Sequence, residues 1–234
     1  MAKTLPKIKT IALKPHIDAD TADEMIDNRK VKLFQSLLKK PKKSEIHLHS
    51  LTLFYEAFLI LSGKYSADFI RDTKHTVHVD KNVRELILDD KVYPIAQKKS
   101  VLSKLEPSWK NKVKIEFQER LILENEDDIA FDHHGKVVDL SYENTKKIVE
   151  KYPRKILNEK NDNIKRPEIT VESAINKLNS KLKKPAEKGI KSLDEKIDLS
   201  EILEVYVPIY EARLIGPKKK IKILRIDAVR KKVL

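Results

Sequence analysis

A six-residue sequence that occurs twice restricts the fold of this 234-residue chain more than any other feature. The segment Tyr55–Ile60 reads Tyr-Glu-Ala-Phe-Leu-Ile, and Tyr210–Ile215 reads Tyr-Glu-Ala-Arg-Leu-Ile. Each copy is followed by an aspartate that comes after a hydrophobic residue, Asp80 in the first case and Asp227 in the second. Matches that keep the same order along a chain predict that one structural unit is present twice.

The residues before each copy predict a helix. Thr21–Ile26 resembles Thr170–Ile175, and the threonine of each segment is a candidate N-cap residue. Pro41 and Pro185 are expected to end these helices, because proline lacks the N–H group that a helix needs. The apolar residues of the second helix that share one face are Val171, Ala174, Ile175, Leu178 and Leu182.

Runs of β-branched and aromatic residues follow, over Ile46–Leu61 and Ile202–Ile215, and predict strands. A weaker third copy begins at Phe117–Ile122 and continues to Asp132–Gly135, which has the residues of a four-residue turn. We therefore predict an α+β fold of two or three repeated units. Each unit is expected to be a helix plus an antiparallel β-hairpin, packed as helix-on-sheet layers.

The same pattern predicts the domain boundaries. We expect a first helix/β repeat over 1–95, and a middle β-hairpin segment over 96–150 that is the candidate third copy. The polar, proline-flanked segment 151–168 is expected to be a linker. A C-terminal helix/β repeat is expected over 169–234.

The order of a helix, strands and a hairpin with a hydrophobic-Asp turn resembles the PepSY-type repeat. The segments that carry the resemblance are Thr170–Ile175, Tyr210–Leu234, Thr21–Ile26 and Tyr55–Leu88. The resemblance implies a non-catalytic, inhibitory or protein-binding module, which would hold a partner protein or peptide on a strand edge or on the face of Tyr206 and Tyr210. The sequence departs from the family's pattern at Arg84 and Arg230, which stand near the expected turn glycine.

Positive charge is concentrated near the two ends of the sequence. The formal net charge is +13, of which residues 1–50 contribute 11 basic and 6 acidic side chains, and residues 216–234 contribute 8 basic and 1 acidic. Clustered lysines neutralise phosphates and release counterions, so these clusters predict contact with nucleic acid. The alternative is surface charge that only maintains solubility. The expected nucleic-acid-binding residues are Lys39, Lys40, Lys42, Lys43, Lys218, Lys219, Lys220, Lys222, Arg225, Lys231 and Lys232.

Several classes of protein are excluded by composition. The chain has no cysteine, which excludes a disulfide scaffold and a thiol nucleophile and fits a reducing, cytoplasmic location. It has 4 glycines and neither of the glycine-rich phosphate loops. No stretch approaches the roughly 20 apolar residues of a membrane span, and no apolar signal region follows Met1. We expect no membrane association and no cofactor.

The histidines are weak candidates for a metal site. His47 and His49 would share one face of a strand, but His75 and His78 are expected too far along the hairpin to join them. His133 and its neighbour His134 alternate faces in a turn. Because no spacing provides three convergent ligands, we expect no metal and histidines that are half-buried or at the surface.

The acidic residues are also best explained by structure. Asp80, Asp132 and Asp227 occupy equivalent turn positions. Glu56 and Glu211 interrupt apolar strands, and an ion pair between Glu211 and Arg225 on the next strand is expected. We find no catalytic signature, although an enzyme with an unrecognised histidine site remains an alternative.

These observations lead to two hypotheses of function. The first is a non-enzymatic, intracellular binding or scaffold protein whose basic clusters contact nucleic acid or a ribonucleoprotein through phosphates. The second is a PepSY-like protein–protein interaction module that binds a peptide or a partner protein.

Overall fold

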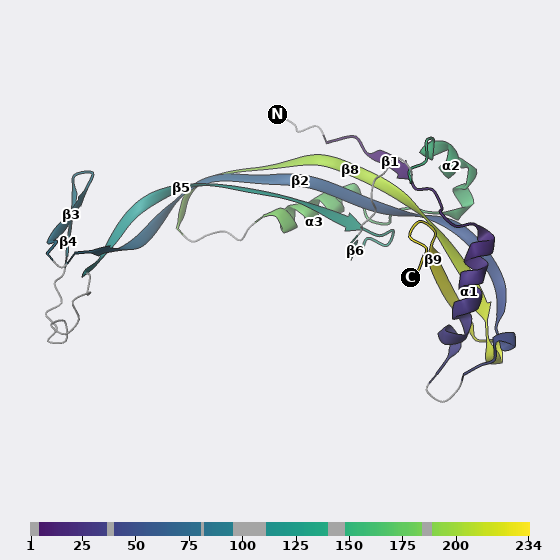
Figure 1. Cartoon of the computed structure of the whole chain (residues 1–234). Coiled ribbons are helices and arrows are strands. Elements are labelled where there is room, and N and C mark those ends of the chain that lie inside the picture. Colours follow the sequence, from purple (N-terminus) through teal and green to yellow (C-terminus); the bar gives the residue numbers. More distant parts are fainter. Residues whose placement is uncertain (1–4, 37–39, 81, 96–110, 140–147, 184–188) are drawn as a thin grey trace. The chain divides into compact units, whose positions relative to one another are not determined.

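The computed structural model describes residues 5–36, 40–80, 82–95, 111–139, 148–183 and 189–234 (Figure 1). The chain divides into two compact units. Unit 1 consists of Met1–Lys64, Glu126–Lys183 and Ile197–Leu234, and unit 2 consists of Tyr65–Asn125 and Lys184–Lys196. The three longest strands contribute residues to both units.

Most strands belong to one sheet with the order β10-β9-β8-β2-β5-β6. The short strands β1 and β7 pair in parallel with β8 and β2, respectively. Strand β9 is antiparallel to β8, with Glu211 opposite Arg225. The strands of this sheet are β1 (Lys9–Ala12), β2 (His47–Val79), β5 (Asn111–Phe131), β6 (Val137–Val138), β7 (Ile164–Lys165), β8 (Ile190–Ile215), β9 (Ile221–Asp227) and β10 (Lys232–Val233).

The predicted fold class, repeated helix-plus-hairpin units packed in layers, is wrong. Strands account for 54% of the structure, and one large antiparallel sheet contains both copies of the six-residue sequence. Tyr55–Ile60 lies in β2 and Tyr210–Ile215 lies in β8, and these strands are neighbours in that sheet. The copies have similar surroundings, since Ala57 and Ala212 are both fully buried. Adjacent strands of one sheet can therefore share a sequence without belonging to separate repeats.

Helix α1 (Ala19–Phe34) covers part of the sheet in unit 1 (Figure 1). Its N-cap is Asp18, whose carboxylate accepts a hydrogen bond of 2.9 Å from the backbone N–H of Thr21. Hydrogen bonds from Thr21 lower the pKa of Asp18. The predicted cap Thr21 therefore lies in the first turn of the helix. Ala22 and Ile26 are buried against residues of β8 and β9.

Helix α3 (Val171–Leu182) matches its sequence prediction closely. The hydroxyl of Thr170 accepts a hydrogen bond of 3.2 Å from the backbone N–H of Ser173, which confirms the predicted N-cap. Ala174, Leu178 and Leu182, on the predicted apolar face, are buried. The helix can approach β2 because residue 63 is glycine, where an added Cβ would lie 3.3 Å from Leu178 and 3.0 Å from a backbone oxygen of Asp198.

The segment 151–168 contains helix α2 (Pro153–Glu159) and strand β7. Proline at the first helical position suits α2, because its missing N–H group has no partner there in any helix. Leu157 of this helix is buried in a cluster with Ala12 and Tyr206. Strand β7 places Lys165 opposite Glu56 of β2.

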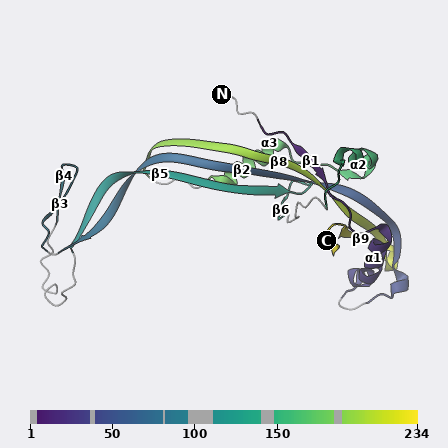
Figure 2. The same ribbon diagram turned by 45° about the horizontal axis from the view of Figure 1, so that its top comes forward.

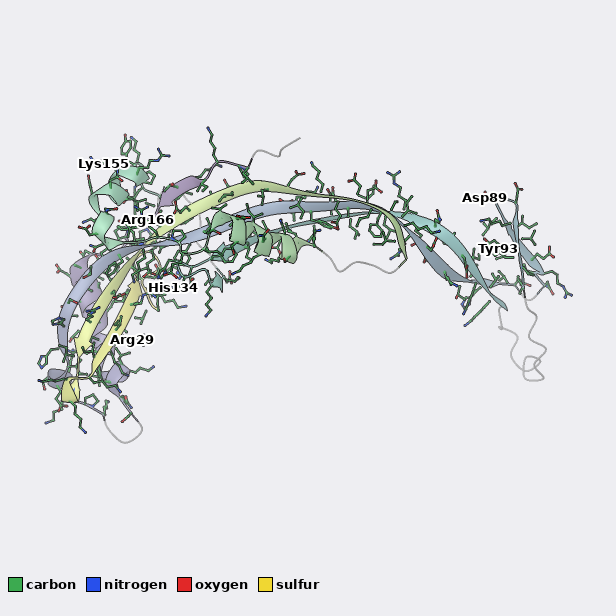
Figure 3. All side chains as sticks on the ribbon, turned by 180° about the vertical axis from the view of Figure 1, so that it is seen from behind. Arg29, Asp89, Tyr93, His134, Lys155 and Arg166 are labelled. Atoms are coloured by element: carbon green, nitrogen blue, oxygen red, sulfur yellow. The ribbon has the colours of Figure 1, made fainter. Side chains whose placement is uncertain are left out.

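Unit 2 contains a separate two-stranded sheet of β3 (Glu85–Leu88) and β4 (Lys91–Pro94). Figure 3 labels Asp89 and Tyr93 in this hairpin. Both residues of its tight turn have positive φ, 44° at Asp89 and 62° at Asp90, as a type I′ turn requires. A small core forms beside the hairpin from Val79, Ile95, Val113 and Ile115.

None of the helices in the described part of the chain is both long and apolar enough to cross a membrane.

Candidate functional site

Two lysine segments that are far apart in the sequence meet at one end of unit 1. The turn between β8 and β9 packs against the end of α1, because an added Cβ at Gly216 would lie 2.4 Å from the ring of Phe34. Figure 1 and Figure 2 both show this turn beside the end of α1 and the start of β2. We call this surface the basic end, and its exposed lysines are Lys40, Lys42, Lys43, Lys218, Lys219 and Lys220.

The turn that carries Lys218, Lys219 and Lys220 has an unusual backbone. The φ angles of Lys218 and Lys219 are 59° and 57°, in the left-handed region that costs a non-glycine residue about 1–2 kcal/mol. Glycine or asparagine would reduce this cost. Strain of this kind persists where a side chain has another use, and here both side chains are cations directed into solvent.

Acidic groups neutralise only part of the basic end. Asp27 forms ion pairs with Lys43 and with Lys30, the second at 2.9 Å, and the hydrogen bonds from these lysines lower the pKa of Asp27. A carboxylate oxygen of Glu45 accepts a hydrogen bond of 2.6 Å from the backbone N–H of Lys42. Among the described residues, no acidic side chain forms an ion pair with the three lysines of the β8–β9 turn.

The remaining residues predicted to bind nucleic acid are not among the exposed lysines of the basic end. Lys222 donates a hydrogen bond to the backbone oxygen of Leu33 and lies 5.5 Å from the centre of the Phe34 ring, so it holds α1 to the sheet. Arg225 forms an ion pair with the buried Glu56. Lys231 and Lys232 are exposed beyond the other end of β9, roughly 20 Å away at the usual rise of a strand. Lys39 lies outside the described residues.

A second group of charges in unit 1 surrounds the buried Glu56 and His133 with partly buried partners. We call it the ionic cluster, and its members are Glu56, His133, Lys165, Glu211 and Arg225. Lys165 connects the two glutamates of the repeated sequence, because its Nζ lies 2.9 Å from Glu56 and 3.0 Å from Glu211. Glu56 is only 2% exposed and also accepts a hydrogen bond from Arg225. Arg225 stands opposite Glu211 on β9, but the predicted ion pair between them is wrong: Arg225 pairs with Glu56, and Glu211 pairs with Lys165.

The charges of the ionic cluster balance one another, as in an ion-pair network that stabilises a fold. Two carboxylates meet two cations, and burial lowers the pKa of His133, which favours the neutral imidazole beside Glu56. The Nδ1 atom of His133 lies 3.6 Å from Glu56, too far for a hydrogen bond. Lys165 is not among the residues predicted from the sequence. The sequence indicates such a residue only indirectly: glutamates at positions 56 and 211, within apolar strands, each need a cation nearby.

The three turn aspartates have the structural role that was predicted. In each case one carboxylate oxygen accepts hydrogen bonds from backbone N–H groups of the following residues. Asp227 is fully buried and also accepts a hydrogen bond of 2.6 Å from the side chain of Arg230. The donors are Asn82 for Asp80, His134 and Lys136 for Asp132, and Val229 and Arg230 for Asp227.

The histidines do not gather at one site, although the rings of His133 and His134 lie 3.9 Å apart. His47 and His49 are exposed at the start of β2. In unit 2, His75 donates a hydrogen bond of 2.7 Å to Glu119 and stacks on Phe117. Within the described ranges, no group of three or more potential ligands is arranged to hold a metal ion.

The face of Tyr206 and Tyr210 is closed to a peptide, because these side chains are only 1% and 7% exposed. The hydroxyl of Tyr206 donates a hydrogen bond of 2.9 Å to Glu204, and burial raises the pKa of Tyr206. Of the two places expected to hold a partner in a PepSY-like module, only strand edges remain.

Comparison of the chain with models of protein families, with curated proteins and with solved structures finds no match in any of the three.

Proposed function

We propose that this protein is a non-enzymatic binding or scaffold protein whose basic end contacts the phosphates of nucleic acid, either free or in a ribonucleoprotein. The observation that supports the proposal is the meeting of two separate lysine segments at one end of unit 1. The strained backbone of Lys218 and Lys219 also favours it, since a purely structural turn would be more stable with glycine.

The chemistry of lysine defines the expected mode of binding. An ammonium group is a compact point charge on a flexible stem, so it binds phosphate without reading the bases. Its affinity comes from the release of counterions, which makes binding strongly dependent on salt. We therefore expect the basic end to bind single strands and duplexes without sequence preference. A cytoplasmic location, where RNA and ribonucleoproteins are partners, is part of the same proposal.

A salt titration with matched variants tests the proposal. Binding of mixed-sequence RNA and DNA is measured by fluorescence anisotropy between low and moderate salt. The triple variant K218Q/K219Q/K220Q removes three charges from the basic end. The control variant K91Q/K112Q/K114Q removes three charges from exposed lysines of unit 2. Both variants have the same net charge, so a difference between them reports the position of the charges.

The basic-end variant is expected to reduce the slope of log affinity against log salt by about 2–3, because each lost phosphate contact removes about 0.7–0.9. The control variant is expected to bind with nearly the slope of the wild-type protein. If the wild-type protein at micromolar concentration binds no nucleic acid in low salt, the proposal is wrong. Equal losses in the two variants would contradict the assignment to the basic end.

A further inference from the structure

A groove of about 520 Å³ lies in unit 1 between β1 and α2. Its size is within the usual range for sites that bind small ligands or single nucleotides. Four of its eight lining residues are cations, none is acidic, and the four are Lys9, Lys151, Arg154 and Lys155. Such a lining favours an anionic ligand.

Backbone hydrogen bonds next to the groove hold β1 to the segment that precedes α2. The N–H group of Glu150 donates a hydrogen bond of 2.8 Å to the carbonyl of Ala12, at the end of β1. The N–H group of Lys14 donates a second one of 2.8 Å to Ile148. Pro153 then starts α2 directly after Tyr152. The groove is therefore present before any ligand binds, which reduces the entropy lost on binding.

An exposed aromatic ring stands in the groove. Tyr152 is 62% exposed, and its side chain makes no capping hydrogen bond to α2, so most of the ring is accessible to a ligand. Lys151 lies 5.5 Å from the centre of this ring. Ile8, 47% exposed, adds apolar surface to the lining. An aromatic ring beside cations is the combination on which the bases of single-stranded nucleic acid stack.

The cations of the groove are accessible to phosphate. Lys155, labelled on α2 in Figure 3, forms only a 4.0 Å ion pair with Glu159, and both side chains are more than half exposed. Lys9 pairs with Glu201 at 2.6 Å, also at the surface, where ion pairs contribute little. Among the described residues, no ion pair involves Lys151 or Arg154. Phosphates can therefore replace these contacts at small cost.

We infer that this groove binds single-stranded nucleic acid, with one base stacked on Tyr152 and the neighbouring phosphates held by Lys151, Arg154 and Lys155. The inference rests on the proposed function and adds a preference for single strands. The basic end contributes affinity for any phosphate backbone. The groove distinguishes unpaired bases, because a base inside a duplex offers no free face to a tyrosine ring.

Tyrosine variants of the full-length protein test this inference. Anisotropy measures binding of a labelled 12-nucleotide oligo(U) and of a 20-base-pair mixed-sequence RNA duplex at constant low salt. The variant Y152A is expected to bind the single strand about 5- to 100-fold more weakly, since it loses one base–aromatic stack. Duplex affinity is expected to stay within about twofold. The variant Y152F keeps the ring and should bind as the wild type does.

The variant F117A is the matched control, because Phe117 is an exposed aromatic residue of unit 2, 43% exposed, outside the groove. It is expected to leave single-strand binding unchanged. If Y152A binds oligo(U) as tightly as the wild type while the basic-end variant is weakened, the inference is wrong and the proposed function stands. Loss of affinity in Y152F equal to that in Y152A also overturns it. If the wild-type protein binds neither probe, the proposed function itself fails.

Discussion

At the scale of single residues, Lys165 connects the buried Glu56 with the partly buried Glu211 in unit 1. It is the only residue of the described part that bridges both glutamates of the repeated sequence. A buried carboxylate without a cation loses its hydration, and no ion pair compensates for that loss. The position of Lys165 on the short strand β7, opposite Glu56, is therefore part of what makes these two strands compatible with a buried glutamate.

Replacing Lys165 with methionine is expected to lower the free energy of unfolding by about 2–3 kcal/mol. The reason is that the carboxylate of Glu211 loses its ion-pair partner, while Arg225 still pairs with Glu56. Urea denaturation monitored by circular dichroism measures the loss. In the double variant K165M/E211Q the loss is expected to be smaller than the sum of the single losses. The exposed control K155M should change stability by less than about 0.5 kcal/mol. A similarly small effect of K165M would contradict the role given to Lys165.

His133 is expected to make stability depend on pH. Burial lowers its pKa in the folded protein below the ordinary value of about 6.5. The unfolded chain therefore takes up the proton first as the pH falls. Stability is complete above about pH 6.5 and decreases as the pH falls from there toward the folded pKa. The loss is about 1.4 kcal/mol for each pH unit that separates the folded pKa from the unfolded one.

Denaturation at pH 7.5 and at pH 5 measures this effect, since pH 5 lies above the range in which the aspartates titrate. The variant H133Q should lose less stability between the two pH values than the wild type loses. The variant H47Q, at an exposed histidine, should behave as the wild type. Equal pH dependence in H133Q and the wild type would show that His133 does not contribute.

At the scale of elements, turns and caps were predictable from the sequence because their interactions are local. The aspartate of each turn binds N–H groups within four residues, and the Thr170 cap binds one within three. The apolar face of α3 follows from its helical period. The N-cap of α1 was missed, because Asp18 and Thr21 both have suitable side chains and only the backbone decides between them.

Lysine at positions 218 and 219 of the β8–β9 turn is expected to lower the stability of the protein and to raise its affinity for phosphate. Substituting glycine for Lys218 or Lys219 removes a left-handed non-glycine residue and should raise the free energy of unfolding by up to about 1 kcal/mol. Thermal denaturation measures this gain, and anisotropy with RNA measures the accompanying loss of affinity. The control K220G has no positive φ to relieve and should not gain stability. A loss of stability in K218G and K219G would contradict the backbone argument.

The turn aspartates provide a matched pair of substitutions. Asp227 is fully buried and accepts hydrogen bonds from two backbone N–H groups and from Arg230, whereas Asp80 is exposed and accepts one from Asn82. The variant D227A is expected to cost about 2–4 kcal/mol, because it leaves buried donors without acceptors. The variant D80A should cost less than about 1 kcal/mol. Urea denaturation of both variants checks the difference, and equal losses would contradict it.

At the scale of the whole molecule, the sequence predicted strands but not how they pair. The repeated sequence predicts two units, and this prediction is wrong because pairing partners are distant in sequence and no local pattern specifies them. Strand β2 lies next to β8, more than a hundred residues later. The positions of the lysines were known, whereas their meeting at the basic end depends on that pairing. The same pairing engages Arg225 with Glu56, which removes it from the candidate surface.

Backbone protection is expected to differ strongly between parts of the sheet. Val205–Tyr210 of β8 is buried at every position. The β3–β4 hairpin has only two strands, and its Ile87 and Val92 are 69% and 54% exposed. Because isolated hairpins are marginally stable, amides of β3 and β4 should exchange much faster than those of β8 in hydrogen-exchange mass spectrometry. Equal protection of the two segments would contradict this expectation.

Three of the boundaries between the two units lie within strands, in β2, β5 and β8, and the fourth follows the C-cap of α3. The chain crosses between the units four times, after Lys64, Asn125, Lys183 and Lys196. A protease that cuts the chain once, even at one of these crossings, therefore leaves the units joined by at least three covalent connections. Neither unit corresponds to a contiguous gene fragment, so recombinant expression of one unit alone would require rejoining separate segments with new linkers.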